Sequence, residues 1–180
     1  MAIAIANRYA RALADVVGRS GEYGAALEGL EDFAAAYGES ADLRELFETP
    51  AVTLAEKGKV VDALVKRLSA APVTGNFLRV LAVNYRMGLI REVAQAFRKV
   101  ANDRLGIVEV KISSAHALAQ AERKALGARF RELTHHEVQL EFHLEPELLG
   151  GIRAQIGSTV YDGSVRSQLE RIGRQLTGAS

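Results

Sequence analysis

The chain contains no cysteine, and only 3 of its 180 residues are proline. Without cysteine there can be no disulfide, no thiolate nucleophile and no cysteine-ligated metal, which excludes several classes of enzyme. No apolar run reaches the roughly 18 residues that a membrane-spanning helix needs. Arg8 also follows the N-terminus too closely for the apolar core of a signal peptide. The sequence therefore predicts a chain that neither spans nor crosses a membrane by itself.

The overall charge balance lacks the basic excess of a nucleic-acid-binding domain. Hydrophobic residues make up 48% of the chain and charged residues 25%, which is typical of a globular protein and excludes wholesale disorder. The net charge of +1 hides two opposed segments. Residues 15–62 hold eleven acidic and four basic side chains, whereas residues 63–104 hold eight basic and two acidic ones. This distribution predicts either oppositely charged helices that pack together or helices that face charged partner surfaces.

The first 105 residues show helical periodicity throughout. A first helix over 5–17 and a second over 23–37 are separated by glycines, and Ser40 is placed to cap a third helix that ends before Pro50. A capping box of Thr53 and Glu56 opens a fourth helix, which Pro72 breaks. A fifth helix is expected from about 74 to 86, and a sixth follows Gly88. Helices joined by such short turns predict a six-helix bundle.

At Gly106 the apolar period changes from 3.6 to 2. Strands are expected over 107–112, 138–144 and 152–156, with a helix after the first and another after a turn near the C-terminus. The predicted fold class is α+β, with a six-helix bundle over 1–105 followed by a small mixed alpha/beta domain over 106–180. The residues predicted to make structural turns in this second domain are Gly150, Gly151, Asp162 and Ser164.

No arrangement of residues predicts catalysis, a cofactor or a metal. The glycines form no phosphate-binding loop, and Ser113 and Ser114 near His116 lack the surroundings of a nucleophile elbow. The only plausible metal cluster lies where alternation places it on the polar face of a strand, so a solvated sheet surface is the favoured interpretation. Its members are His135, His136, Glu137, Glu141 and His143.

The first and fifth predicted helices have apolar arcs wider than one core contact needs. In the fifth helix, Leu78 and Ala82 flank an apolar set that includes Phe77 and Leu81. Two such helices could frame a groove for an amphipathic partner helix, or both could lie at the centre of the bundle. Periodicity alone leaves both interpretations open.

Three runs of sequence resemble the delta subunit of F-type ATP synthase, the family of the oligomycin sensitivity conferral protein. The first is Asn7-Arg8-Tyr9-Ala10-Arg11-Ala12-Leu13, and the second is Asn76-Phe77-Leu78-Arg79-Val80-Leu81 with Asn84, Arg86 and Leu89. The third and most specific is Leu148-Leu149-Gly150-Gly151-Ile152-Arg153, followed by Ile156-Gly157 and then by Asp162-Gly163-Ser164-Val165 and Leu169. The resemblance covers essentially the whole chain.

The resemblance implies a non-catalytic stator subunit, present in one copy per complex, that stops the catalytic head from turning with the rotor. In that family the helical domain receives the N-terminal helix of an alpha subunit, and the C-terminal domain holds the end of the b subunits of the peripheral stalk. The alpha contact is carried over to Tyr9, Leu13, Val16, Phe77, Val80, Leu81 and Asn84. The b contact is carried over to Val165, Leu169, Ile172 and Leu176.

The location implied by this resemblance is the cytoplasmic face of a bacterial plasma membrane, with attachment through the complex. No nucleic-acid partner is expected on this reading. The alternative hypothesis is a helical adaptor or an RNA-associated regulator that uses the basic 63–104 segment.

Overall fold

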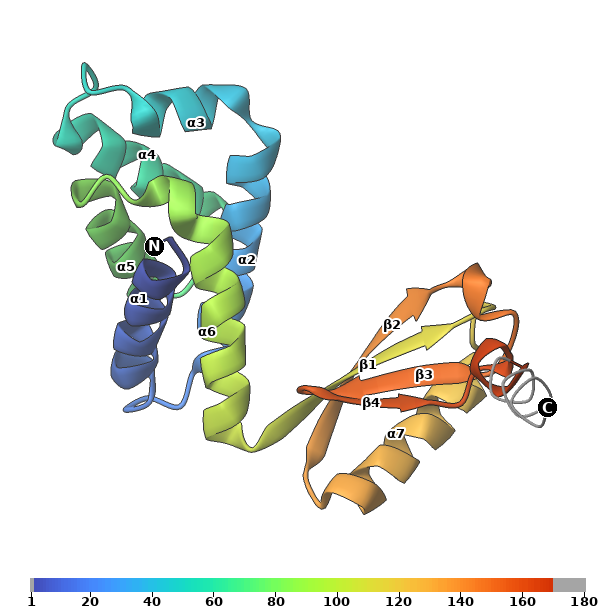
Figure 1. Ribbon diagram of the computed structural model, residues 1–180. Coiled ribbons are helices and arrows are strands. Elements are labelled where there is room, and N and C mark those ends of the chain that lie inside the picture. The colour runs from blue at the N-terminus through green and yellow to red at the C-terminus, as the bar shows by residue number, and fades with distance from the viewer. Residues whose placement is uncertain (1, 170–180) are drawn as a thin grey trace. The chain divides into compact units, whose positions relative to one another are not determined.

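Helices follow one another from Ala2 to Leu105 in the computed structural model, which describes residues 2–169 (Figure 1). They are α1 (Ala2–Val17), α2 (Tyr23–Glu39), α3 (Ala41–Glu48), α4 (Leu54–Arg67), α5 (Pro72–Val83) and α6 (Ile90–Leu105), with a short 3-10 helix, η1 (Met87–Leu89), before α6. The N-terminal part of the chain is therefore helical, as its periodicity predicts.

The predicted caps at the starts of α3 and α4 are confirmed. The Ser40 hydroxyl accepts a hydrogen bond from the backbone N–H of Leu43 at 3.2 Å. At α4 the Thr53 hydroxyl accepts from the Glu56 N–H at 3.3 Å, while the Glu56 carboxylate accepts from the Thr53 N–H at 2.9 Å. These contacts satisfy backbone donors that have no partner within their own helix.

The limits predicted for the fifth helix are wrong at both ends. Pro72 does not precede the helix but begins it, because proline already has a helical φ and its missing N–H would have no partner in the first turn. The helix ends at Val83 because Tyr85 adopts a left-handed conformation, with φ of 54°. The N–H groups of Tyr85 and Arg86 then donate to the carbonyls of Ala82 and Leu81, which closes the helix as a Schellman motif.

The acidic and basic segments pair with each other inside the helical part. The Arg98 guanidinium on α6 donates to the Glu31 carboxylate on α2 at 2.8 Å. The Arg79 guanidinium on α5 donates to the Asp62 carboxylate on α4 at 2.9 Å. Packing of oppositely charged helices, one of the two predicted outcomes, is therefore observed at these two contacts.

A four-stranded mixed sheet follows α6, which confirms the α+β class. Its strands are β1 (Ile107–Ser114), β2 (Glu137–Leu144), β3 (Ile152–Ile156) and β4 (Thr159–Asp162), in the order β2-β1-β3-β4. β1 pairs in parallel with β2, and α7 (Gln120–Thr134) makes the crossover that such a pair requires. β3 pairs antiparallel with both β1 and β4, and a short 3-10 helix, η2 (Pro146–Leu148), precedes it.

The chain divides into two compact units, each with its own core. Unit 1 is Met1–Ala101 and unit 2 is Asn102–Ser180, so the division falls inside α6, just before the predicted boundary near 105. The core of unit 1 includes Leu30, Phe33, Leu78 and Phe97. In unit 2 the centre of the core is made by Val110, Ile112, Phe130 and Ala154, where α7 packs on the apolar face of the sheet.

Candidate functional site

An aromatic contact brings α1 and α5 together in unit 1. The rings of Tyr9 and Phe77 meet edge to face, with centroids 6.3 Å apart. The same two helices also carry exposed valines: Val16 on α1 is 57% exposed and Val80 on α5 is 47% exposed. These residues, together with Asn84 at the end of α5, are called the α1–α5 surface below. It offers apolar side chains to solvent on two adjacent helices.

Two residues predicted to contact a partner lie in the core instead. Leu13 is 2% exposed and Leu81 is 0% exposed, so neither side chain can reach a partner while unit 1 remains folded. Both occupy the middle of the stripe that their helices turn toward the rest of unit 1. Phe77 is also largely buried, at 8%, and its ring packs against that of Tyr9.

The end of α5 is held by a buried lysine that sequence reasoning missed. The Lys57 ammonium is fully buried and donates to the carbonyls of Phe47 at 2.9 Å and Thr49 at 3.0 Å, at the end of α3. It also lies 5.0 Å from the centre of the Tyr85 ring. Lys57 precedes Val61 by four residues, so its place on the apolar stripe of α4 is the sequence signal that could have identified it.

Asn84, the polar member of the α1–α5 surface, lies at the C-terminal end of α5. As the last-turn cap of α5, it donates from its side-chain amide to the Val80 carbonyl at 2.7 Å. The asparagine therefore satisfies the backbone carbonyl of the exposed Val80 near the end of the helix. Its side chain remains exposed.

In unit 2 the structure brings the four predicted turn residues together. Gly151 has φ of 73°, and a Cβ at this position would collide with the Gly163 carbonyl oxygen. The Val165 N–H donates to the Gly150 carbonyl, and the Gly163 N–H donates to the Ile152 carbonyl, both at 3.0 Å. We call this contact between 150–152 and 162–165 the glycine clamp.

Asp162 and Ser164 complete the glycine clamp by capping the helix start that follows it. The Asp162 carboxylate accepts from the Ser167 hydroxyl at 2.7 Å and from the Ser164 N–H at 2.9 Å. The Ser164 hydroxyl accepts from the Ser167 N–H at 3.2 Å, as expected of a cap. These hydrogen bonds lower the pKa of Asp162 to about 2, and the bond from the Ser167 hydroxyl has the largest effect.

Two of the predicted stalk contacts are exposed beside the glycine clamp. Val165 is 40% exposed, and Leu169, one helical turn later, is 56% exposed. The other two predicted contacts, Ile172 and Leu176, lie outside the described residues.

One histidine of the candidate metal cluster, His143, lies on β2 of the sheet. His143 Nε2 lies 3.4 Å from a Glu141 carboxylate oxygen, and both side chains are about half exposed. Among residues 2–169 no group of three or more histidine, aspartate or glutamate side chains is placed to hold a metal ion. The interpretation as solvated sheet surface fits this geometry.

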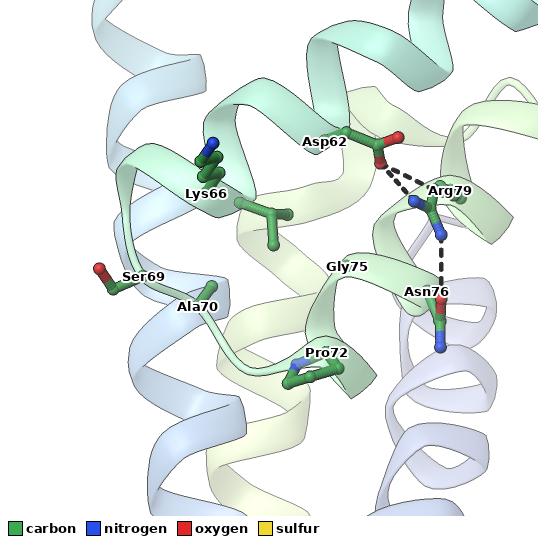
Figure 2. A pocket seen from close by; sticks show the side chains of 9 residues that line it. Asp62, Lys66, Ser69, Ala70, Pro72, Gly75, Asn76 and Arg79 are labelled. Atoms are coloured by element: carbon green, nitrogen blue, oxygen red, sulfur yellow. Dashed lines mark hydrogen bonds and ion pairs between the residues drawn. The ribbon is translucent and has the colours of Figure 1, made fainter.

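A hollow of about 470 Å3 lies between α4 and α5 in unit 1. Figure 2 shows that Asp62, Arg79 and Asn76 line one side of it, with Lys66 and Pro72 on others. The Arg79 guanidinium donates to both Asp62 and Asn76, so its hydrogen-bond partners are other residues that line the hollow. Arg98 is paired with Glu31 in the same way, so two members of the basic 63–104 segment form ion pairs within unit 1.

No helix within the described part of the chain has the length and apolar character needed to cross a membrane.

Comparison with known proteins identifies the family. The model of the ATP synthase delta (OSCP) subunit family matches residues 5–176. A subunit delta of ATP synthase from Acidobacterium capsulatum is 44% identical over 174 residues, covering 96% of this chain and 97% of the relative. The subunit delta from Myxococcus xanthus is 36% identical over 176 residues, covering 97% of each chain.

A solved structure shares the fold. One chain of the cryo-EM structure of the Toxoplasma gondii mitochondrial ATP synthase hexamer superposes with a TM-score of 0.70 at 23% identity, covering 96% of this chain and 97% of that one. The runs around Asn7, Asn76 and the glycine clamp, from which the resemblance was drawn, all fall inside the matched residues. The chain belongs to the ATP synthase delta (OSCP) subunit family, and is a structural component of the peripheral stalk and not itself an enzyme.

Proposed function

We propose that this chain joins the catalytic head of the ATP synthase to the b subunits of its stalk. The helices α1 to α6 act as the six-helix bundle of the family, and their α1–α5 surface binds the N-terminal helix of one alpha subunit. Unit 2 binds the end of the b subunits. One copy works in each complex, at the cytoplasmic face of a bacterial plasma membrane.

The observation that supports the alpha contact is the exposure of Val16 and Val80 on α1 and α5, the two helices that the Tyr9–Phe77 contact brings together. An amphipathic helix could bury its apolar stripe on these side chains while its polar face stays in water. At about 25 cal/mol per Å2, burial of several hundred Å2 of apolar surface corresponds to on the order of 10 kcal/mol before the costs of ordering are subtracted. Tight attachment is therefore feasible without any charged anchor.

For unit 2 the support comes from Val165 and Leu169. They lie four residues apart on a helix start whose cap and backbone are held by the glycine clamp. Because the clamp orders this turn in advance, a partner would lose little free energy in ordering it on binding.

The alpha contact is tested by titrating the full-length chain with a peptide of the first twenty or so residues of the alpha subunit. We expect one-to-one binding that Val16→Asp and Val80→Asp each weaken by about tenfold or more, because each buries a charge in an apolar contact.

Ile3→Asp is the matched control for this titration. Ile3 is 71% exposed on the same helix as Val16, and thirteen residues at 3.6 per turn place it roughly 140° away around α1. Its substitution should leave the affinity unchanged. Equal losses for Ile3→Asp and Val16→Asp, or no loss for Val80→Asp in a folded chain, would contradict this location for the alpha helix.

A further inference from the structure

Leu149 is an exposed leucine in a backbone conformation that favours glycine. Its φ is 64°, a left-handed value that is an outlier for a bulky L-residue, and its side chain is 66% exposed. Glycine would adopt the same turn without steric strain. The chain keeps a leucine where neither backbone geometry nor burial calls for one.

The core does not account for Leu149. The preceding residue, Leu148, is 1% exposed and fills the apolar position at the end of η2, so this turn already contributes one leucine to the interior. The Leu149 N–H donates to the Pro146 carbonyl at 3.1 Å, which fixes the turn through the backbone alone. The leucine side chain is therefore not needed to form the turn.

Leu149 lies next to the glycine clamp in the sequence. The next residue, Gly150, accepts a hydrogen bond from the Val165 N–H, and a Cβ on Gly150 would lie 3.1 Å from a Val165 methyl group. Leu149 thus directly precedes the residue that contacts Val165, and Leu169 continues the helical face of Val165 one turn on. The three exposed side chains, Leu149, Val165 and Leu169, are called the clamp patch.

Charge near the clamp patch indicates what kind of helix fits it. Glu147 is exposed two residues before Leu149, and within residues 2–169 its carboxylate makes no hydrogen bond or ion pair. Arg153, the basic residue of the nearby strand, is instead engaged by Glu145 at 3.3 Å and Asp162 at 3.6 Å. Arg166, the exposed arginine that follows Val165, also has an interaction partner, so Glu147 presents a carboxylate near Leu149 that complements a basic side chain on a partner.

We infer that Leu149 is a binding residue for the stalk: its side chain anchors the apolar stripe of an α-helix of the b subunit, and Glu147 pairs with a lysine or arginine that flanks this stripe. The left-handed turn holds the leucine outward before the partner arrives, so no rearrangement is needed on binding. The inference rests on the proposed function, because it assigns residues to the stalk contact of unit 2.

The test measures the affinity of the full-length chain for the soluble part of the b subunit from the same organism, by calorimetry. Leu149→Gly should weaken binding by about tenfold or more, as expected for a central apolar anchor, while the melting temperature stays level or rises because glycine relieves the left-handed strain. Leu149→Asn, which also tolerates this conformation but is polar, should weaken binding similarly. Glu147→Lys should also weaken binding, and the loss of affinity should be larger at low salt than at high salt because salt screens the charge.

His135→Gly is the matched control. His135 is likewise exposed and left-handed, with φ of 55°, but it caps the end of α7 and is not part of the clamp patch. Its replacement relieves the same kind of strain and should leave the affinity unchanged.

The outcomes separate the inference from the proposed function. If the unchanged chain binds the b subunit and Leu149→Gly binds equally well, the inference is overturned while the stalk contact stands. If the unchanged chain, folded by its melting curve, does not bind the b subunit, the stalk contact itself is wrong.

Discussion

At the scale of single residues, Lys57 shows how a charge can be buried without a carboxylate. Two backbone carbonyls at the end of α3 accept from its ammonium, and the Tyr85 ring lies near it. The last carbonyls of a helix carry the negative end of its dipole, which favours a cation there. One lysine thereby links the end of α3, the first turns of α4 and the turn after α5.

Lys57→Met should lower the free energy of unfolding by about 1–3 kcal/mol, because buried carbonyls lose charged donors while the side-chain volume is nearly kept. Urea unfolding of the full chain measures this change. Lys59→Met, at an exposed lysine of the same helix, should change stability by less than about 0.5 kcal/mol. If both variants are as stable as the unchanged chain, desolvation of the ammonium cancels the benefit of its hydrogen bonds.

At the scale of elements, the family signature near the C-terminus is a structural device. Gly151 admits the backbone of Gly163 at a distance that no side chain would allow, and Asp162 ends β4 while capping the next helix start. The signature residues therefore join β3, β4 and that helix start into one unit. The exposed leucines and valine beside them are held in place by this arrangement.

The glycine clamp should have a characteristic pH dependence. The pKa of Asp162 falls from 3.8 to about 2 on folding, so its contribution to stability is complete above about pH 4 and is lost as the pH falls through 2. Asp162→Asn should therefore be less stable than the unchanged chain at pH 7, and the difference should shrink between pH 4 and 2.

Urea unfolding at a series of pH values checks this expectation for Asp162. Glu147→Gln serves as control, since its exposed carboxylate makes no contact within the described residues and should show no difference at any pH. If the difference in the free energy of unfolding between Asp162→Asn and the unchanged chain stays constant down to pH 2, the charge of Asp162 does not stabilise the glycine clamp.

At the scale of the whole molecule, the proposed role depends on having two contacts in one chain. Each unit has its own core, so each surface can be preformed independently of the other. When one contact opens, the other keeps the released surface at a high effective concentration near its partner, so complete release is slow. A strut under torque needs this slow release more than it needs one very tight contact.

This predicts a non-additive effect on residence time. In an assembled complex that holds both alpha and b subunits, Val80→Asp or Leu149→Gly alone should leave the labelled chain slow to exchange with unlabelled chain, and the double variant should exchange much faster than either. A chase followed by fluorescence measures these rates. Exchange by a single variant as fast as by the double variant would argue that only one contact holds the subunit.

The sequence by itself determined the types of the elements, the caps at Ser40, Thr53 and Ser164, and the family. Ser40, the Thr53–Glu56 box and the Gly150–Gly151 pair act through neighbours or through backbone conformation, which local sequence specifies. Only the tertiary structure decided which residues of an apolar arc face solvent. Periodicity gives the angle of a side chain around its helix, but not what other helices cover it, so Leu13 and Leu81 could not be told from Val16 and Val80. The stripe of α4 indicated that Lys57 could be buried, but only the tertiary structure showed that carbonyls at the end of α3 accept its hydrogen bonds. The exposure of Leu149 could likewise not be read from its neighbours in the sequence.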